Sequence, residues 1–379
     1  MSARPRRLQR AAVAGAALLL GPWAARPAGA QVTWRDLVVT IGASVEGYSG
    51  SLSAVTGPIA DSTDHALAAV GEMGVRGVVS LGQARSRSFA ISFDGGMRQT
   101  AALGFQLRDY APREWVGSAS GRYSQGLGGW GSLVIGGGVR GRSVRDRPPM
   151  PLFLQPGYAT LQGSVGVLTR SFDGVTFDGQ VDLELADYHA LEFVPQLDLL
   201  DRTSSGLEAG VRWGGRAAMR FYGGFRWTAY SNQGSFDPED PFRRDRTARV
   251  GLEWTYSGAL LAQVGVDGTV NRSNSNRPEY DAVSARALVT APLPLDFSLN
   301  VFALLTMKSY VQSTDFVRLV PGEEADNASV AYLQVGRPIA TDLDGAFRLG
   351  WTRAETDIGD AYYRRFGASL QLNYRPKGF

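Results

Sequence analysis

Apolar and polar residues alternate with a period of two along most of the chain, and the clearest stretch runs from Arg365 to Arg375. Its first set of positions is apolar: Phe366, Ala368, Leu370, Leu372 and Tyr374. The intervening set is polar or small: Arg365, Gly367, Ser369, Gln371, Asn373 and Arg375. Because successive side chains of a β-strand point to opposite faces, this pattern predicts a strand with one apolar and one polar face.

The same alternation recurs upstream. It predicts strands near residues 67–82, 86–94, 99–109, 115–125, 130–142, 158–169, 174–187, 205–213, 217–230, 247–257, 259–271, 280–290, 295–310, 329–338, 344–355 and 363–375. Residues 36–48 show the pattern as well, with Val39, Ile41 and Val45 set against Thr40 and Glu46. No helical period, sequence repeat or linker interrupts the series, so we expect a single domain.

Three further features separate a membrane barrel from a soluble β-sandwich, which also alternates. The strands are about ten residues long or more, as a tilted membrane strand requires. The connections alternate between tight turns, such as Gly214-Gly215 and Ser257-Gly258, and long polar segments, such as 143–157 and 231–246. Aromatic residues stand near strand ends, as interfacial girdles do: Trp115, Tyr123, Trp213, Trp227, Tyr230, Trp254, Tyr256, Trp351 and Tyr374.

These features predict an all-β fold, a transmembrane antiparallel β-barrel. An open sheet edge in hydrocarbon would leave unpaired backbone groups that cost several kcal/mol each, so the strands must close into a ring. Single-chain bacterial barrels have an even number of strands, and the alternation provides seventeen candidate segments. We therefore expect about 16 strands, within a range of 14–18.

The N-terminus does not follow the barrel pattern. Arg4, Arg6, Arg7 and Arg10 precede a short apolar run at 11–20, and Ala28-Gly29-Ala30 has the small-residue spacing of a signal peptidase site. Residues 1–30 are therefore predicted to be a cleaved signal peptide, and residues 31–379 to form the barrel. Cleavage would remove five arginines and no acid, which changes the formal net charge from +3 to −2.

Composition narrows the function classes. The mature chain has no clustered basic face, so we expect no nucleic-acid partner. Cysteine is absent, which excludes a disulfide framework. After the N-terminus, no segment approaches the ~18 apolar residues of a helical membrane span.

If the apolar face meets lipid, the polar face lines a lumen that carries charges of both signs. The candidate selectivity residues are Arg122, Arg140, Asp178, Asp182, Glu184, Glu208, Arg212, Arg220, Arg226, Arg249 and Glu253, with Arg142, Asp267, Arg286 and Arg348 on the same face. Two interpretations stay open. Either the charges line an open pore and select solutes, or they pair across strands and fill a closed interior.

The C-terminal strand carries the most specific motif. Gly367 is followed by the apolar residues Leu370 and Leu372, then by Tyr374, and the chain ends at Phe379. This motif resembles the β-signal of Gram-negative outer-membrane barrels, which implies delivery to the barrel-assembly machinery. Pro376 departs from the alternation, so we expect the strand to end near Tyr374.

Over residues 37–379 the chain resembles porin-sized outer-membrane barrels. That resemblance implies a place in the cell outer membrane, contact with its lipids and lipopolysaccharide, and leaves open a homo-oligomer. Loop residues Arg142, Arg145 and Arg147 are the candidates for contact with lipopolysaccharide phosphates.

Catalytic and metal sites have weaker support. Asp187-Tyr188-His189 has the Asp-x-His spacing of omptin-type outer-membrane proteases, but the second acidic pair, Asp342 and Asp344, falls in a turn predicted at the opposite end. Acids cluster at 237–245 and at 323–326, where the lack of EF-hand spacing favours solvated loops over a calcium site. We expect no catalytic residue, no metal and no cofactor.

The leading functional expectation is an outer-membrane, porin-like channel for passive diffusion of small hydrophilic solutes. The alternative is a non-conducting structural or surface-interaction barrel whose external loops bind a partner. The third and weakest is an omptin-like protease.

Overall fold

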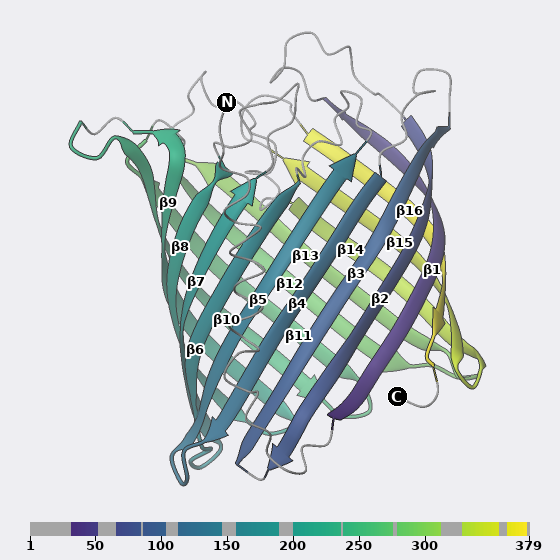
Figure 1. The fold of residues 1–379 in the computed structure, drawn as a ribbon, viewed down its shortest axis with the longest axis horizontal. Coiled ribbons are helices and arrows are strands. Elements are labelled where there is room, and N and C mark those ends of the chain that lie inside the picture. The colour runs from purple at the N-terminus through teal and green to yellow at the C-terminus, as the bar shows by residue number, and fades with distance from the viewer. Residues whose placement is uncertain are drawn as a thin grey trace.

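The computed structural model describes residues 32–51, 66–84, 86–103, 113–145, 157–188, 200–235, 238–275, 279–311, 328–355 and 362–376. These residues form sixteen β-strands wound into one barrel (Figure 1). The strands are β1 (Val32–Ser51), β2 (Ala66–Ala84), β3 (Arg87–Leu103), β4 (Arg113–Gly126), β5 (Gly131–Arg145), β6 (Tyr158–Thr169), β7 (Val175–Tyr188), β8 (Arg202–Gly214), β9 (Ala217–Gly234), β10 (Phe242–Ser257), β11 (Leu261–Ser273), β12 (Tyr280–Pro292), β13 (Ser298–Tyr310), β14 (Ala328–Ala340), β15 (Leu343–Glu355) and β16 (Tyr362–Tyr374). Within the described ranges, no helix is long and apolar enough to cross a membrane.

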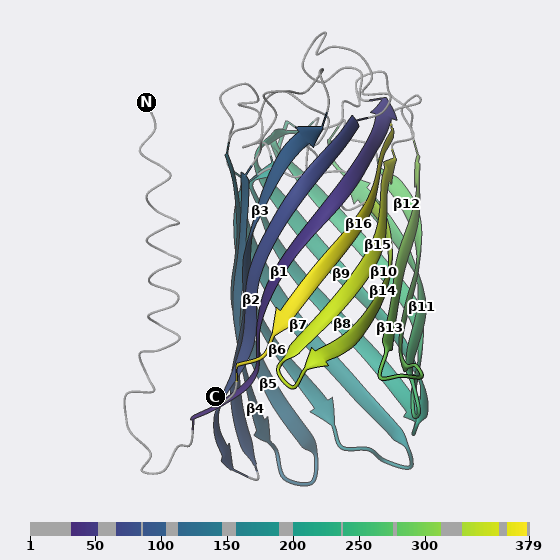
Figure 2. The same cartoon turned by 90° about the vertical axis from the view of Figure 1, so that its right-hand side faces the viewer.

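The barrel is closed by its first and last strands. Each strand pairs antiparallel with the next, and β16 pairs back onto β1, from Val39 opposite Tyr374 to Ser51 opposite Tyr362. Figure 2 shows β1 and β16 side by side at this closure. β16 ends at Tyr374, as Pro376 predicted. The ring has no open edge, so its backbone groups are paired without help from water.

The predicted strand number is confirmed, but one boundary inside the series was wrong. Residues 86–94 and 99–109 were expected to be two strands, but residues 87–103 form the single strand β3, and residues 104–109 lie outside the described part of the chain. Gly95 and Gly96 interrupt the side-chain pattern but not the pairing, and a Cβ on Gly96 would lie 2.8 Å from the Met73 carbonyl oxygen. The extra segment at 36–48 is part of β1, which makes the count even.

Tight and long connections alternate along the chain, as predicted, so the tight turns all lie at one end of the barrel. β8 and β9 are joined by a turn in which Gly214 has a φ of 108°, and a Cβ there would lie 2.3 Å from the Ala217 carbonyl oxygen. Glycine relieves both the backbone strain and the clash. The loop predicted at 231–246 is shorter than expected, because β9 continues to Gly234 and β10 begins at Phe242. Short turns mark the periplasmic end of such barrels, and β16 also ends there.

The two faces of the wall differ as the alternation predicted. On β7 the outward side chains of Phe177, Val181 and Leu183 are 51–59% exposed. Their neighbours Asp178 and Asp182 lie on the other face and make ion pairs there. An apolar belt of this kind around a closed ring is stable only in lipid. The protein is therefore an outer-membrane β-barrel, and the interior of the ring is its polar side.

Most of the predicted girdle aromatics point outward. Trp115, Trp213, Trp227, Trp254 and Tyr374 are 39–48% exposed on the outer face. Tyr230 is a correction, because it faces inward and is 6% exposed. The Arg243 guanidinium lies 4.3 Å from the centre of its ring, so Tyr230 anchors a cation near the external rim rather than a lipid headgroup.

Candidate functional site

Charged side chains on the inward faces of β7, β8 and β9 form an ion-pair network. Arg220 lies between two acids, with its Nε 3.1 Å from Asp178 Oδ1 and its Nη2 2.9 Å from Glu208 Oε1. Closer to the external end, Arg226 Nη2 donates to Asp182 Oδ2 at 2.8 Å. One guanidinium on β9 thus bridges β8 and β7. Charge-assisted hydrogen bonds of this kind fix the relative positions of neighbouring strands.

A second part of the network is centred on Tyr222, which is 2% exposed. Arg249 binds Asp267 through both Nε, at 3.1 Å, and Nη2, at 2.7 Å. The Tyr222 hydroxyl donates to Asp267 Oδ1 at 3.3 Å. The guanidiniums of Arg220, Arg249 and Arg286 lie 4.9, 5.4 and 6.0 Å from the centre of the Tyr222 ring. The ring therefore packs among three cations, a favourable arrangement for an aromatic face.

Glycines on neighbouring strands make room for these flat-lying side chains. A Cβ on Gly251 would lie 2.4 Å from the Tyr222 ring, and one on Gly206 would lie 2.4 Å from the Asp182 carboxylate. A Cβ on Gly210 would lie 2.9 Å from Arg220 Nε. The glycine content of the strands thus lets charged groups lie along the wall instead of projecting across the lumen.

Gly251→Ala is expected to displace the Tyr222 ring and to destabilise the barrel by about 1–3 kcal/mol, the usual cost of overpacking. The control is Gly350→Ala on β15, an inward-facing position where a Cβ meets no atom within 4 Å. Guanidinium unfolding of the refolded barrel in lipid vesicles measures both variants. Equal unfolding free energies for the two variants would argue against a packed Tyr222 cluster.

Further ion pairs line the inward face towards the external end. Arg142 Nη2 lies 2.8 Å from Glu114 Oε2, and Arg202 Nη2 lies 3.7 Å from Glu184 Oε1. Arg142 was expected to meet lipopolysaccharide in a loop, but it belongs to β5, is 7% exposed and faces the lumen. Arg147 lies outside the described residues.

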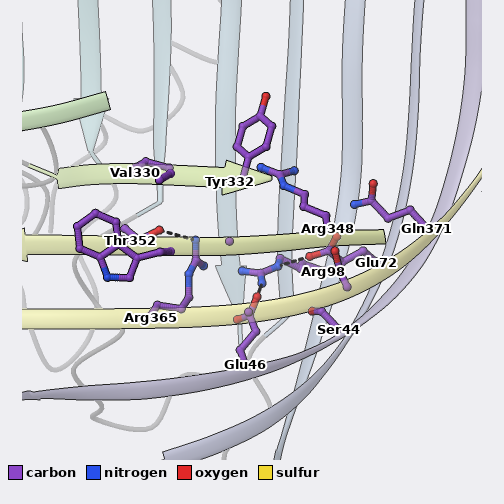
Figure 3. Close-up of a pocket in the computed structure, with 15 residues that line it drawn as sticks. Ser44, Glu46, Glu72, Arg98, Val330, Tyr332, Arg348, Thr352, Arg365 and Gln371 are labelled. Atoms are coloured by element: carbon purple, nitrogen blue, oxygen red, sulfur yellow. Dashed lines mark hydrogen bonds and ion pairs between the residues drawn. The ribbon is translucent and has the colours of Figure 1, made fainter. Parts of the chain in front are cut away.

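One charged cluster was missed by the sequence analysis. Arg98 on β3 donates from Nε to Glu72 Oε1 at 2.9 Å and from Nη2 to Glu46, so it joins the first three strands (Figure 3). Both glutamates stand at polar positions of alternating strands, which is the sequence feature that points to them. Arg98 was missed because one predicted strand ended at residue 94 and the next began at residue 99, which left residue 98 in a turn.

Six inward arginines have no acid partner within ion-pair distance in the described part of the chain: Arg76, Arg122, Arg140, Arg212, Arg348 and Arg365. Arg140 and Arg348 lie 6.0 and 3.9 Å from the ring centres of Tyr158 and Tyr332. Arg365 Nη2 donates to Thr352 Oγ1 at 3.4 Å. Their positive charges face the lumen.

Two hollows in the lumen wall bring charged and polar residues together. The larger, of about 520 Å³, lies along β4 to β9 and includes Arg122, Gln180, Asp182, Glu208 and Arg226. The smaller, of about 160 Å³, lies at the barrel closure and includes Arg98, Arg348 and Arg365. Sites that combine both charge signs in this way suit polar solutes more than apolar ones.

The acidic pairs noted for protease chemistry lie at opposite ends of the wall. Asp187 is near the external end of β7, whereas Asp344 is the second residue of β15, at the periplasmic end, and binds Arg375 at 2.6 Å. His189 lies outside the described residues. Of the acids noted for calcium, Asp240 and Asp245 are bound by Arg244 and Arg243, at 3.2 and 2.6 Å.

No model of a known protein family matches the chain, and neither does any curated protein. Several solved structures are similar at low identity. A loop L8 deletion mutant of OmpT, an outer-membrane protein of Vibrio cholerae, is 13% identical, covers 90% of this chain and 99% of its own, and has a TM-score of 0.41.

A bacterial polysaccharide outer membrane secretin is 13% identical over 89% of this chain and 98% of its own, with a TM-score of 0.38. A Pseudomonas aeruginosa FadL homologue is 10% identical over 89% of each chain, with a TM-score of 0.36. At these identities and scores, the likenesses do not bear on what this barrel binds or transports.

Proposed function

We propose that the protein is a porin-like channel through which small hydrophilic solutes diffuse passively, and that it prefers anions. The observation that supports the preference is the imbalance of unpaired charge on the inward face. Six arginines there lack an acid partner within ion-pair distance, whereas among the inward acids in the paired parts of the described strands only Asp94 lacks a cation partner. Asp94 faces Arg76 in the register, so the excess is five arginines. A lumen with an excess of one sign concentrates the opposite ions.

Strand number supports conduction. Barrels of 16 to 18 strands are wide enough to leave an aqueous channel, whereas eight-stranded barrels are filled by their own side chains. The ion pairs of β7 to β12 join adjacent or next-adjacent strands beside glycines, an arrangement that favours an open axis. Paired charges therefore line the channel, and the unpaired arginines determine the sign of the net charge in the lumen.

Planar-bilayer recording of the refolded chain tests this proposal. We expect discrete open-channel steps, and a reversal potential across a potassium chloride gradient whose sign reports anion preference. Steps with cation preference would reject the selectivity. The absence of steps would favour the alternative, a non-conducting barrel whose external loops bind a partner.

The expected membrane partners belong to the same proposal. Arg246 is exposed on the outward face of β10 near the external end, where lipopolysaccharide phosphates lie. The C-terminal strand, with Gly367, Leu370 and Leu372 in β16, supports delivery to the barrel-assembly machinery. Phe379 lies outside the described residues. We propose no enzymatic activity for this barrel.

A further inference from the structure

We infer that the lumen holds a binding site for small carboxylates that also carry hydroxyl groups, such as a sugar acid. The site is the hollow of about 160 Å³ where β14, β15 and β16 meet β1 to β3 (Figure 3). This inference rests on the proposed function, since the solute must enter the lumen, and it names the class of solute for which the channel has a specific site.

Two arginines form the anion-binding side of the hollow. The Arg348 guanidinium lies 3.9 Å from the centre of the Tyr332 ring, and that ring stacks on Phe302 with a centroid distance of 5.3 Å. The stack holds Arg348 in place without neutralising its charge. Among the described residues, Arg365 is held only by Thr352, through a 3.4 Å hydrogen bond, and Figure 3 shows both arginines at the same hollow. Planar guanidiniums are the donors that match a carboxylate best.

An unused hydroxyl group lies in the same place. Ser44 is 8% exposed, and within the described part of the chain its Oγ has no hydrogen-bond partner. Buried polar groups are normally hydrogen-bonded, so an isolated one at the edge of a polar hollow points to a missing ligand atom. Gln371 and Ser369 of β16 line the hollow beside it and add further donors.

The opposite side of the hollow is acidic. Glu46 and Glu72 both bind the guanidinium of Arg98, so two carboxylates lie on this side. Its carboxylate oxygens can accept hydrogen bonds from hydroxyl groups, but they repel a second negative charge on a ligand. The hollow is therefore suited to a singly charged ligand with its carboxylate at Arg348 and Arg365 and its hydroxyls towards Glu46 and Glu72. Inorganic phosphate, partly a dianion at neutral pH, fits it less well.

Equilibrium dialysis of the full, detergent-solubilised barrel against glucuronate, glucose and inorganic phosphate tests the site. We expect glucuronate to bind more tightly than either other probe. Arg348→Gln and Arg365→Gln should each weaken glucuronate binding about tenfold, and Ser44→Ala about threefold, because a hydrogen bond to a charged ligand is lost. The control is Arg337→Gln, which removes an equal charge from the outward face of β14 and should leave the affinity unchanged.

The dialysis does not depend on conduction, so the two proposals can fail separately. Glucuronate binding without channel steps would support the binding site and reject the channel. Equal affinity for glucuronate in the original chain, Arg348→Gln and Arg365→Gln would overturn the site, even in a conducting barrel. Tighter binding of phosphate than of glucuronate would overturn the assignment to carboxylates. Gel mobility before and after heating verifies that each variant is folded.

Discussion

Replacing Arg122, Arg140 and Arg212 together with glutamate is expected to convert an anion-preferring channel into one that prefers cations. These arginines lie on β4, β5 and β8, and each substitution exchanges an unpaired positive charge for a negative one. Two unit charges 4 Å apart in water interact by about 1 kcal/mol, so changes at three places along an ion's path can alter the ion ratio by roughly tenfold or more. Reversal potentials across a salt gradient measure this ratio.

The triple glutamine variant is the matched control, because it removes the positive charges without adding negative ones. We expect it to weaken the anion preference without inverting it. Recordings at low ionic strength give the largest difference, since the Debye length is about 10 Å at 0.1 M salt. A reversal potential with the same sign and size in all three proteins would show that these arginines do not control selectivity.

Val181→Arg is expected to destabilise the barrel by about 2–4 kcal/mol, the cost of a lipid-facing arginine near the middle of the bilayer. Val181 lies at the centre of β7 on the outward face and is 51% exposed. Its neighbour Gln180 points into the lumen, at the hollow lined by Asp182 and Glu208. Gln180→Arg should therefore change the unfolding free energy by only about 0.5 kcal/mol.

The comparison is informative because both variants add the same side chain to the same strand, one residue apart. Guanidinium titration in lipid vesicles provides both unfolding free energies. Similar losses of unfolding free energy at the two positions would mean that both faces of β7 lie in the same solvent.

The fold could be predicted from the sequence because lipid imposes a strict rule on each strand. Outward residues must be apolar and the ring must close, so the period of two along β7, β10 and β16 identifies both the strands and their faces. Pro376 also predicted the end of β16. At Gly95-Gly96 the alternation cannot be recognised, because glycine has no side chain to mark a face. The single strand β3 was therefore predicted as two strands.

The pairing of the lumen charges could not be predicted in the same way. Alternation placed Arg220, Asp178 and Glu208 on one face, but which of them meet depends on the register between strands. Register depends on the turns, whose lengths range from two to five residues at the periplasmic end. The unsatisfied hydroxyl of Ser44 could not be predicted from the sequence either, because only the packing around it shows that it lacks a partner among the described residues.

The most direct test of a water-filled, anion-preferring lumen inside a lipid-facing shell uses the absence of cysteine from the chain. Single cysteines replace inward Gln162 and Ser164 and outward Val165 and Val167, all on β6, and each protein is refolded into vesicles. We predict that charged, water-soluble thiol reagents label the two inward positions, the anionic reagent faster than the cationic one, and leave the two outward positions unlabelled. Equal labelling at all four positions, or faster reaction with the cationic reagent, would contradict the account.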